Sequence, residues 1–107
     1  MHIFGGMVQD AFQALADEGR REILFMLAAG NKSTAEICQQ FTSSRQAVNK
    51  HLAVLVASQL IKANADGRAV VYKLDTTALK EIKKWMKALT EKAEASAKKS
   101  HLKRARK

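Results

Sequence analysis

Polar side chains that can bind nucleic acid bases gather in one short segment, which reads Ser-Arg-Gln-Ala-Val-Asn-Lys over residues 44–50. An arginine can donate two parallel hydrogen bonds to O6 and N7 of guanine, and glutamine or asparagine can pair in the same way with N6 and N7 of adenine. A serine at the start of a helix suits a phosphate oxygen. The candidate contacts to duplex DNA are therefore Ser44, Arg45, Gln46, Asn49 and Lys50. The alternative is a solvated polar helix face with no partner.

A helix over residues 44–57 would present these side chains on one face and hold its other face against a core. Its apolar residues recur at the three- and four-residue spacing of an amphipathic helix. They are Val48, Leu52 and Leu55. A shorter helix should precede it, because Ser33-Thr-Ala-Glu36 has the capping-box pattern. Only Thr42 and Ser43 then separate the two helices, and this arrangement predicts a helix-turn-helix.

The remaining elements are predicted from changes in the hydrophobic period. Helical spacing indicates two further helices before the motif, over residues 7–16 and 20–29. Alternating polarity over residues 60–74, interrupted by Asp66-Gly67, predicts a β-hairpin with an Asp-Gly turn. Arg68 beside this turn is a candidate contact to the minor groove or the DNA backbone, or an ordinary exposed arginine.

From Thr76 onward the period is helical again, and it stays close to a heptad. The apolar residues of this seam are Leu79, Ile82, Met86, Leu89 and Ala93. A seam of this kind predicts packing against another helix.

Length and charge limit the classes of protein to be considered. A chain of 107 residues is too short for two cores, so we expect one domain over residues 1–95. The net charge of +9 favours a polyanionic partner, nucleic acid or an anionic membrane surface. Six basic residues and no acidic one fall within residues 98–107, so we expect a disordered basic tail over 96–107. Such a tail is either only solvated or attracts DNA non-specifically.

No pattern of an enzyme, a metal site or a cofactor site is apparent. The chain lacks a glycine-rich phosphate loop and an obvious nucleophile with its base. The candidate metal ligands are scattered without a known ligand spacing: His2, Cys38, His51 and His101. A structural role is expected for His51, and a buried apolar role for Cys38. One cysteine and no long apolar run predict a soluble cytoplasmic protein without a membrane segment.

Four segments, in this order, resemble the ArsR (arsenical-resistance repressor) family of winged helix-turn-helix regulators. They are Phe12–Asp17, Arg20–Leu24, Ala47–Leu55 and Gly67–Leu74, and the agreement spans about residues 8 to 90.

The chain departs from the family pattern at several positions. Glu18-Gly19 replaces the usual Pro-Thr, which leaves Asp17 as a substitute helix cap, and Asn49 replaces a common serine. Ser33 and Ala35 occupy the positions of the sensor cysteines, so the resemblance implies a member without the familiar metal sites.

The resemblance also implies an assembly and an action. The expected fold is mainly α with a small β-hairpin, a winged helix-turn-helix whose first and last helices form a dimer junction. The expected junction residues are Val8, Phe12, Leu79, Ile82, Met86 and Leu89. A two-fold dimer would place two recognition helices about 34 Å apart on a pseudo-palindromic operator. Repression would follow from occlusion of the promoter, which could be the chain's own.

Two other functions remain open on the sequence. The basic charge also fits a protein that coats or bends DNA with little sequence preference. A winged-helix fold can also serve as a protein-interaction module without an operator. The ratio of affinities for an operator and for random duplex DNA would separate these alternatives.

Overall fold

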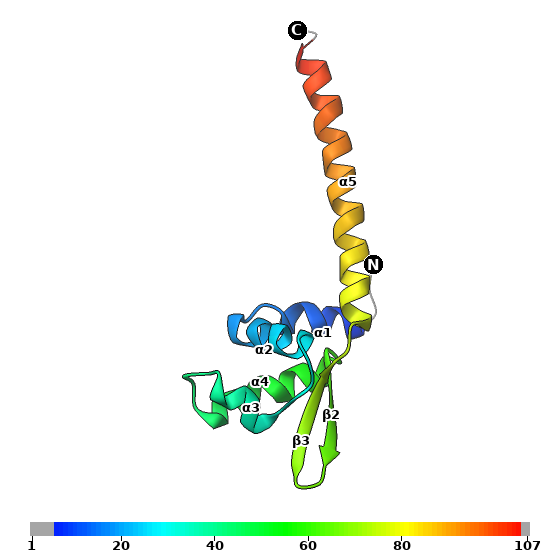
Figure 1. Ribbon diagram of the computed structural model, residues 1–107. Coiled ribbons are helices and arrows are strands. Elements are labelled where there is room, and N and C mark those ends of the chain that lie inside the picture. The colour runs from blue at the N-terminus through cyan, green and yellow to red at the C-terminus, as the bar shows by residue number, and fades with distance from the viewer. Residues whose placement is uncertain (1–5, 106–107) are drawn as a thin grey trace.

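Five helices and three short strands make up the part of the chain that the computed structural model describes, residues 6–105, with side chains described for residues 9–98 (Figure 1). The helices are α1 (Gly6–Ala14), α2 (Glu18–Ala28), α3 (Thr34–Gln39), α4 (Arg45–Ala57) and α5 (Thr77–Ala105). The strands are β1 (Lys32–Ser33), β2 (Ile61–Asp66) and β3 (Ala69–Leu74). The predicted class, mainly helical with a small sheet, is confirmed.

The core lies where one apolar stripe from each helix meets the sheet. The stripe predicted for α4 is buried, since Val48, Leu52 and Leu55 are at most 1% exposed. Ile23 of α2 and Ile37 of α3 join this cluster and are fully buried. The helix-turn-helix is therefore held in place by its own buried faces.

Local capping signals set where the helices begin. The Ser33 hydroxyl accepts from the Glu36 N–H at 3.2 Å, and the Glu36 carboxylate accepts from the Ser33 N–H at 2.9 Å. This reciprocal pair confirms the predicted capping box. Asp17 caps α2 by accepting from the Arg20 N–H at 3.0 Å, so the predicted substitute cap is also confirmed.

The sheet differs from the predicted hairpin in two respects. It has a third strand, β1, which pairs antiparallel with β3. Because β1 has only two residues, its sequence shows no alternating pattern from which a strand could be predicted. The predicted Asp-Gly turn is wrong, because Asp66 pairs with Ala69 and the two-residue loop is Gly67-Arg68. Gly67 has a φ of +63°, and turns of the II′ type place glycine first in the loop for this reason.

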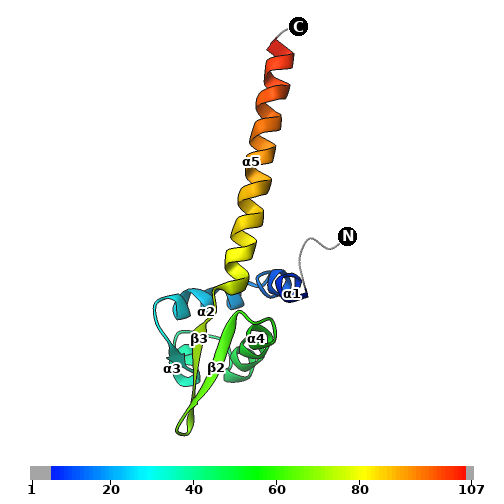
Figure 2. The same ribbon diagram turned by 90° about the vertical axis from the view of Figure 1, so that its right-hand side faces the viewer.

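The last helix extends farther than the sequence suggested. Ala78 and Ile82 in its first turns are buried in the core, and the rest of α5 projects away from the other elements (Figures 1 and 2). The structure describes α5 as continuing to Ala105, whereas the sequence predicted a disordered tail from residue 96. The segment contains no glycine or proline and is rich in alanine and lysine, which favour helix. None of the described helices is long and apolar enough to span a bilayer.

Candidate nucleic-acid interface

The N-cap and the first two turns of α4 carry five of the six side chains predicted to contact DNA, all except Arg68. Each of them is exposed, whereas the opposite side of the helix is buried. Ser44 is the N-cap and its Oγ accepts from the Ala47 N–H at 3.1 Å. A hydroxyl that accepts one bond can still donate its hydrogen, so Ser44 can cap α4 and bind a phosphate at once. The structure thus brings these residues together on one solvent-facing surface.

The segment that forms this surface contains no acidic residue. No aspartate or glutamate occurs between Glu36 and Asp66, while Arg45 and Lys50 lie exposed on α4. An uncompensated positive charge attracts phosphate groups and steers DNA to the site.

The hairpin projects beside α4 and presents Arg68 at its end. β2 packs against α4, and the hairpin loop lies at the end of the molecule opposite the free end of α5 (Figure 2). Arg68 is exposed within the two-residue loop. The corrected turn therefore places this arginine in the loop itself rather than beside it.

Another basic residue of the hairpin, Lys62, has a partner within the fold. Its Nζ lies 3.7 Å from Oδ2 of Asp75, whose Oδ1 accepts from the Thr77 N–H at 3.0 Å. The Thr77 hydrogen bond is the main cause of a lowered pKa at Asp75. Asp75 thus links the base of the hairpin to the start of α5, a contact that the sequence did not reveal.

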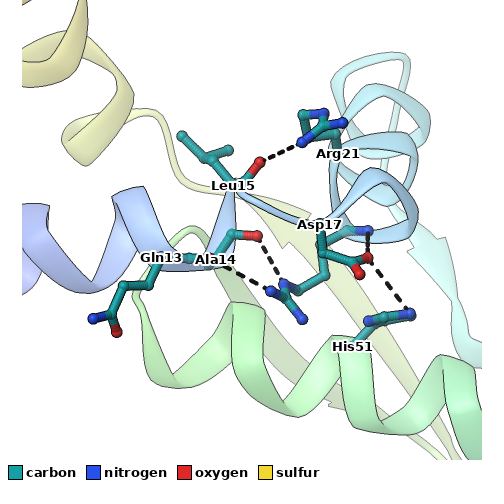
Figure 3. Close-up of polar contacts among 7 residues, drawn as sticks. Gln13, Ala14, Leu15, Asp17, Arg21 and His51 are labelled. Carbon is teal, nitrogen blue, oxygen red and sulfur yellow. Dashed lines mark hydrogen bonds and ion pairs between the residues drawn. The ribbon is translucent and has the colours of Figure 1, made fainter.

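His51 of α4 contacts the N-cap of α2 (Figure 3). Its Nε2 lies 3.7 Å from Oδ2 of Asp17. The hydrogen bond from the Arg20 N–H is the main cause that holds the pKa of Asp17 below its ordinary value. Burial acts in the opposite direction and raises this pKa, while the charge of His51 lowers it further. Gly19 allows the close approach, because a Cβ there would lie 3.0 Å from Nε2 of His51. His51 therefore has the structural role that was expected for it.

Two arginines of α2, Arg20 and Arg21, close the end of α1, and Figure 3 labels the second of them. Arg20 Nε donates to the Ala14 carbonyl oxygen and Arg21 Nη1 donates to that of Leu15, each at 2.7 Å. These bonds satisfy carbonyls that a helix end leaves unpaired. Both arginines hold α2 against α1.

The residues predicted for the dimer junction lie in different environments. Met86 and Leu89 are about half exposed on α5, and Ile82 is buried in the core of the single chain. The Phe12 ring of α1 meets Trp85 of α5 edge-on, with centroids 5.7 Å apart and planes at 80°. Leu79 packs partly buried against the core, and the side chain of Val8 lies outside the described residues.

Within the described side chains, residues 9–98, no three potential metal ligands cluster together. Cys38 is partly buried against the core. His2 and His101 lie outside the described side chains.

Comparison with known proteins gives similarities at the levels of family, sequence and structure. Residues 17–63 match the family model described as bacterial regulatory protein, arsR family. The transcriptional repressor SdpR of Bacillus subtilis (strain 168) is 30% identical over 79 residues, which cover 74% of this chain and 88% of SdpR. The HTH-type transcriptional regulator Rv2034 of Mycobacterium tuberculosis is 39% identical over 85 residues, covering 75% and 79%. A crystal structure of the ArsR family transcriptional regulator RHA00566 superposes with a TM-score of 0.78 at 26% identity, covering 88% and 97%.

Proposed function

The chain belongs to the ArsR family of bacterial regulatory proteins and is a DNA-binding transcriptional regulator, and from this premise we propose that it is a homodimeric repressor. The observation that carries the proposal is the exposed start of α4, which is free of acidic residues and backed by a fully buried stripe. A helix built in this way can enter the major groove of duplex DNA.

The division of labour along α4 follows from the reach of each side chain. Arg45 and Gln46 stand on the first turn, from which recognition helices contact base edges. Asn49 and Lys50 follow one turn later, where an asparagine can read adenine and a lysine can bind guanine or phosphate. Ser44 and the N-terminus of α4 bind a phosphate and fix the register.

The hairpin supplies a second contact to the same duplex. Arg68 in its exposed loop reaches the adjacent minor groove or its phosphates, where the negative potential favours arginine. Gly67 supports this role because it forms the tight turn that exposes Arg68.

The dimer forms through α1 and α5. The ring pair of Phe12 and Trp85 joins these helices within the protomer, and the exposed side chains of Met86 and Leu89 continue the apolar surface along α5. Val8 and Leu79 border this surface in the sequence pattern, whereas Ile82 supports it from the core. Two-fold symmetry would set the recognition helices about 34 Å apart, one turn of DNA, on a pseudo-palindromic operator.

Repression follows from occlusion, since a dimer bound over a promoter excludes RNA polymerase. One of the relatives, SdpR, is named a transcriptional repressor. A regulator that binds chromosomal DNA in a bacterium acts in the cytoplasm. The proposal includes no resident cofactor, metal or enzymatic step.

Binding to the DNA upstream of the chain's own gene, compared with random duplex, tests the proposal. Arg45→Ala and Gln46→Ala should each cost about 1–3 kcal/mol at the operator, or roughly 5- to 150-fold in affinity, with little change on random DNA. Asn31→Ala, at an exposed amide side chain between α2 and β1, outside both α4 and the proposed junction, is the matched control and should change neither affinity.

Two results would overturn the proposal. Equal affinity of the parent for both duplexes would favour a protein that coats or bends DNA, for which the net charge of +9 is the supporting observation. Binding to neither duplex would favour a protein-interaction module.

A further inference from the structure

An apolar cavity of about 220 Å³ lies between α2, the end of β3 and the first turn of α5. Nearly all of its lining surface is apolar, and it comes from residues far apart in the sequence. The apolar lining residues are Leu15, Leu24, Phe25, Ala28, Leu74 and Leu79. The cavity is separate from the exposed face of α4 and from the hairpin loop.

Phe25 at this cavity is unusually exposed for an aromatic side chain. It is 79% exposed, although its neighbours on α2, Ile23 and Leu24, are buried. Scattered apolar side chains on a surface need no explanation, but an exposed ring that borders an apolar cavity is typical of a binding site.

The walls of the cavity are fixed by hydrogen bonds that do not involve the cavity itself. Arg21 lines one side, and its guanidinium is held by the bond to the Leu15 carbonyl oxygen. Its methylene stem therefore presents apolar surface while its charge is engaged elsewhere. At the other side the Asp75 N–H donates to the Leu60 carbonyl oxygen at 2.9 Å, just after Leu74. A cavity with fixed walls is largely preformed.

Size and charge define the occupant. An engineered apolar cavity of about 150 Å³ binds benzene, and sites for drug-sized ligands begin at about 300 Å³. The present cavity, at about 220 Å³, fits one ring with a small substituent. Almost none of the lining surface is polar, so the cavity offers no partner to a charged ligand, and the adjoining surface carries charges of both signs, Glu18, Glu22 and Arg21.

A second copy of the chain is the less suitable occupant. Of the proposed junction residues only Leu79, on the first turn of α5, lines the cavity. The half-exposed apolar residues of α5, Met86 and Leu89, do not line it and lie farther along the helix. We propose that the cavity between α2, β3 and α5 binds a small, neutral, apolar molecule. This binding does not depend on the proposed DNA-binding mode.

Titration of the full chain with toluene, followed by NMR of leucine methyl groups, tests the site. Saturable shifts are expected at Leu74 and Leu79, with no shift at Leu89, which lies outside the cavity. Ala28→Trp adds a ring to the lining without removing a contact and should abolish the saturable shifts. Ala88→Trp makes the same change at an exposed alanine of α5 and should leave them intact.

A second variant guards against a failure of Ala28→Trp to fold. Phe25→Ser replaces an exposed side chain and should weaken toluene binding by about tenfold, since it removes apolar contact area. Shifts that do not saturate, or that persist in folded Ala28→Trp, would overturn the proposal. Binding that appears only when the protein is diluted to a monomer would also overturn it, because a second copy would then be the natural occupant.

Discussion

Replacing Met86 and Leu89 together with glutamine should convert the proposed dimer into a monomer. Glutamine has almost the same helix propensity as leucine and methionine, so the double change removes apolar surface and leaves α5 helical. The two side chains are 50% and 52% exposed in the single chain. Each therefore has about half of its surface left to bury against a partner.

The expected magnitude follows from these exposures. Burying a whole leucine or methionine side chain contributes about 1.5–3 kcal/mol, so the remaining half contributes about 0.75–1.5 kcal/mol. A two-fold dimer buries four such side chains, which gives about 3–6 kcal/mol. The dissociation constant of the dimer should accordingly rise by roughly 10²- to 10⁴-fold.

Sedimentation equilibrium over the micromolar range measures this change, with circular dichroism to verify the helix content. Val54→Gln is the matched control, because Val54 is 40% exposed on α4, outside the two helices of the proposed junction. Ile82 is unsuitable for this test, since it is only 6% exposed and a polar residue there would destabilise the protomer itself. Undiminished association of the double variant, or a monomeric parent at micromolar concentration, would refute the reasoning.

Three further predictions concern the basic C-terminal segment, the stability of the fold at low pH and the response to metals. Deleting residues 98–107 should leave operator affinity and its salt dependence unchanged, because α5 carries this segment away from the hairpin loop (Figure 1). If the slope of log affinity against log salt concentration became shallower by about 0.9 per lost contact, the segment would instead bind phosphates. Asp17→Ala should lower the free energy of unfolding near neutral pH through loss of the cap, as urea denaturation would measure. Because the pKa of Asp17 is held below 3.8, this contribution is complete above that pH and disappears as the pH falls through the lowered value, so the parent and variant should converge in acid; a constant difference would contradict this account. Zinc or arsenite should not release operator DNA through a stoichiometric site, since residues 9–98 hold no cluster of ligands; release that Cys38→Ser abolishes would assign a sensing role to that thiol.

The helix-turn-helix could be predicted from the sequence because its signals are local. The capping box at Ser33 and Glu36 involves residues three apart, and the buried stripe of α4 repeats within one helix. The Asp17 cap is local in the same sense. Interactions of this range depend only on the conformation of one segment, so the residue types and their spacing are sufficient to identify them.

The candidate DNA-binding surface was predictable for the same reason. Once Val48 and Leu52 are assigned to the core, helical geometry places Arg45 and Asn49 on the outside. The turn at Gly67-Arg68 was not predictable to one residue, because the pairing of Asp66 with Ala69 sets the register. Register depends on how two strands align, which a turn dipeptide does not fix by itself.

What the sequence determined by itself was the order and type of the elements and the polar face of α4, all of which rest on periodicity and capping within single segments. Only the tertiary structure decided that Ile82 belongs to the core while Met86 and Leu89 remain exposed, and that Arg20 and Arg21 bond to carbonyls of the segment ending α1. The cavity beside Phe25 likewise exists only in the tertiary structure, because its lining residues come from separate segments. The physical reason is that these features depend on contacts between segments distant in the chain, and a heptad pattern does not say how many turns of a helix the core will cover.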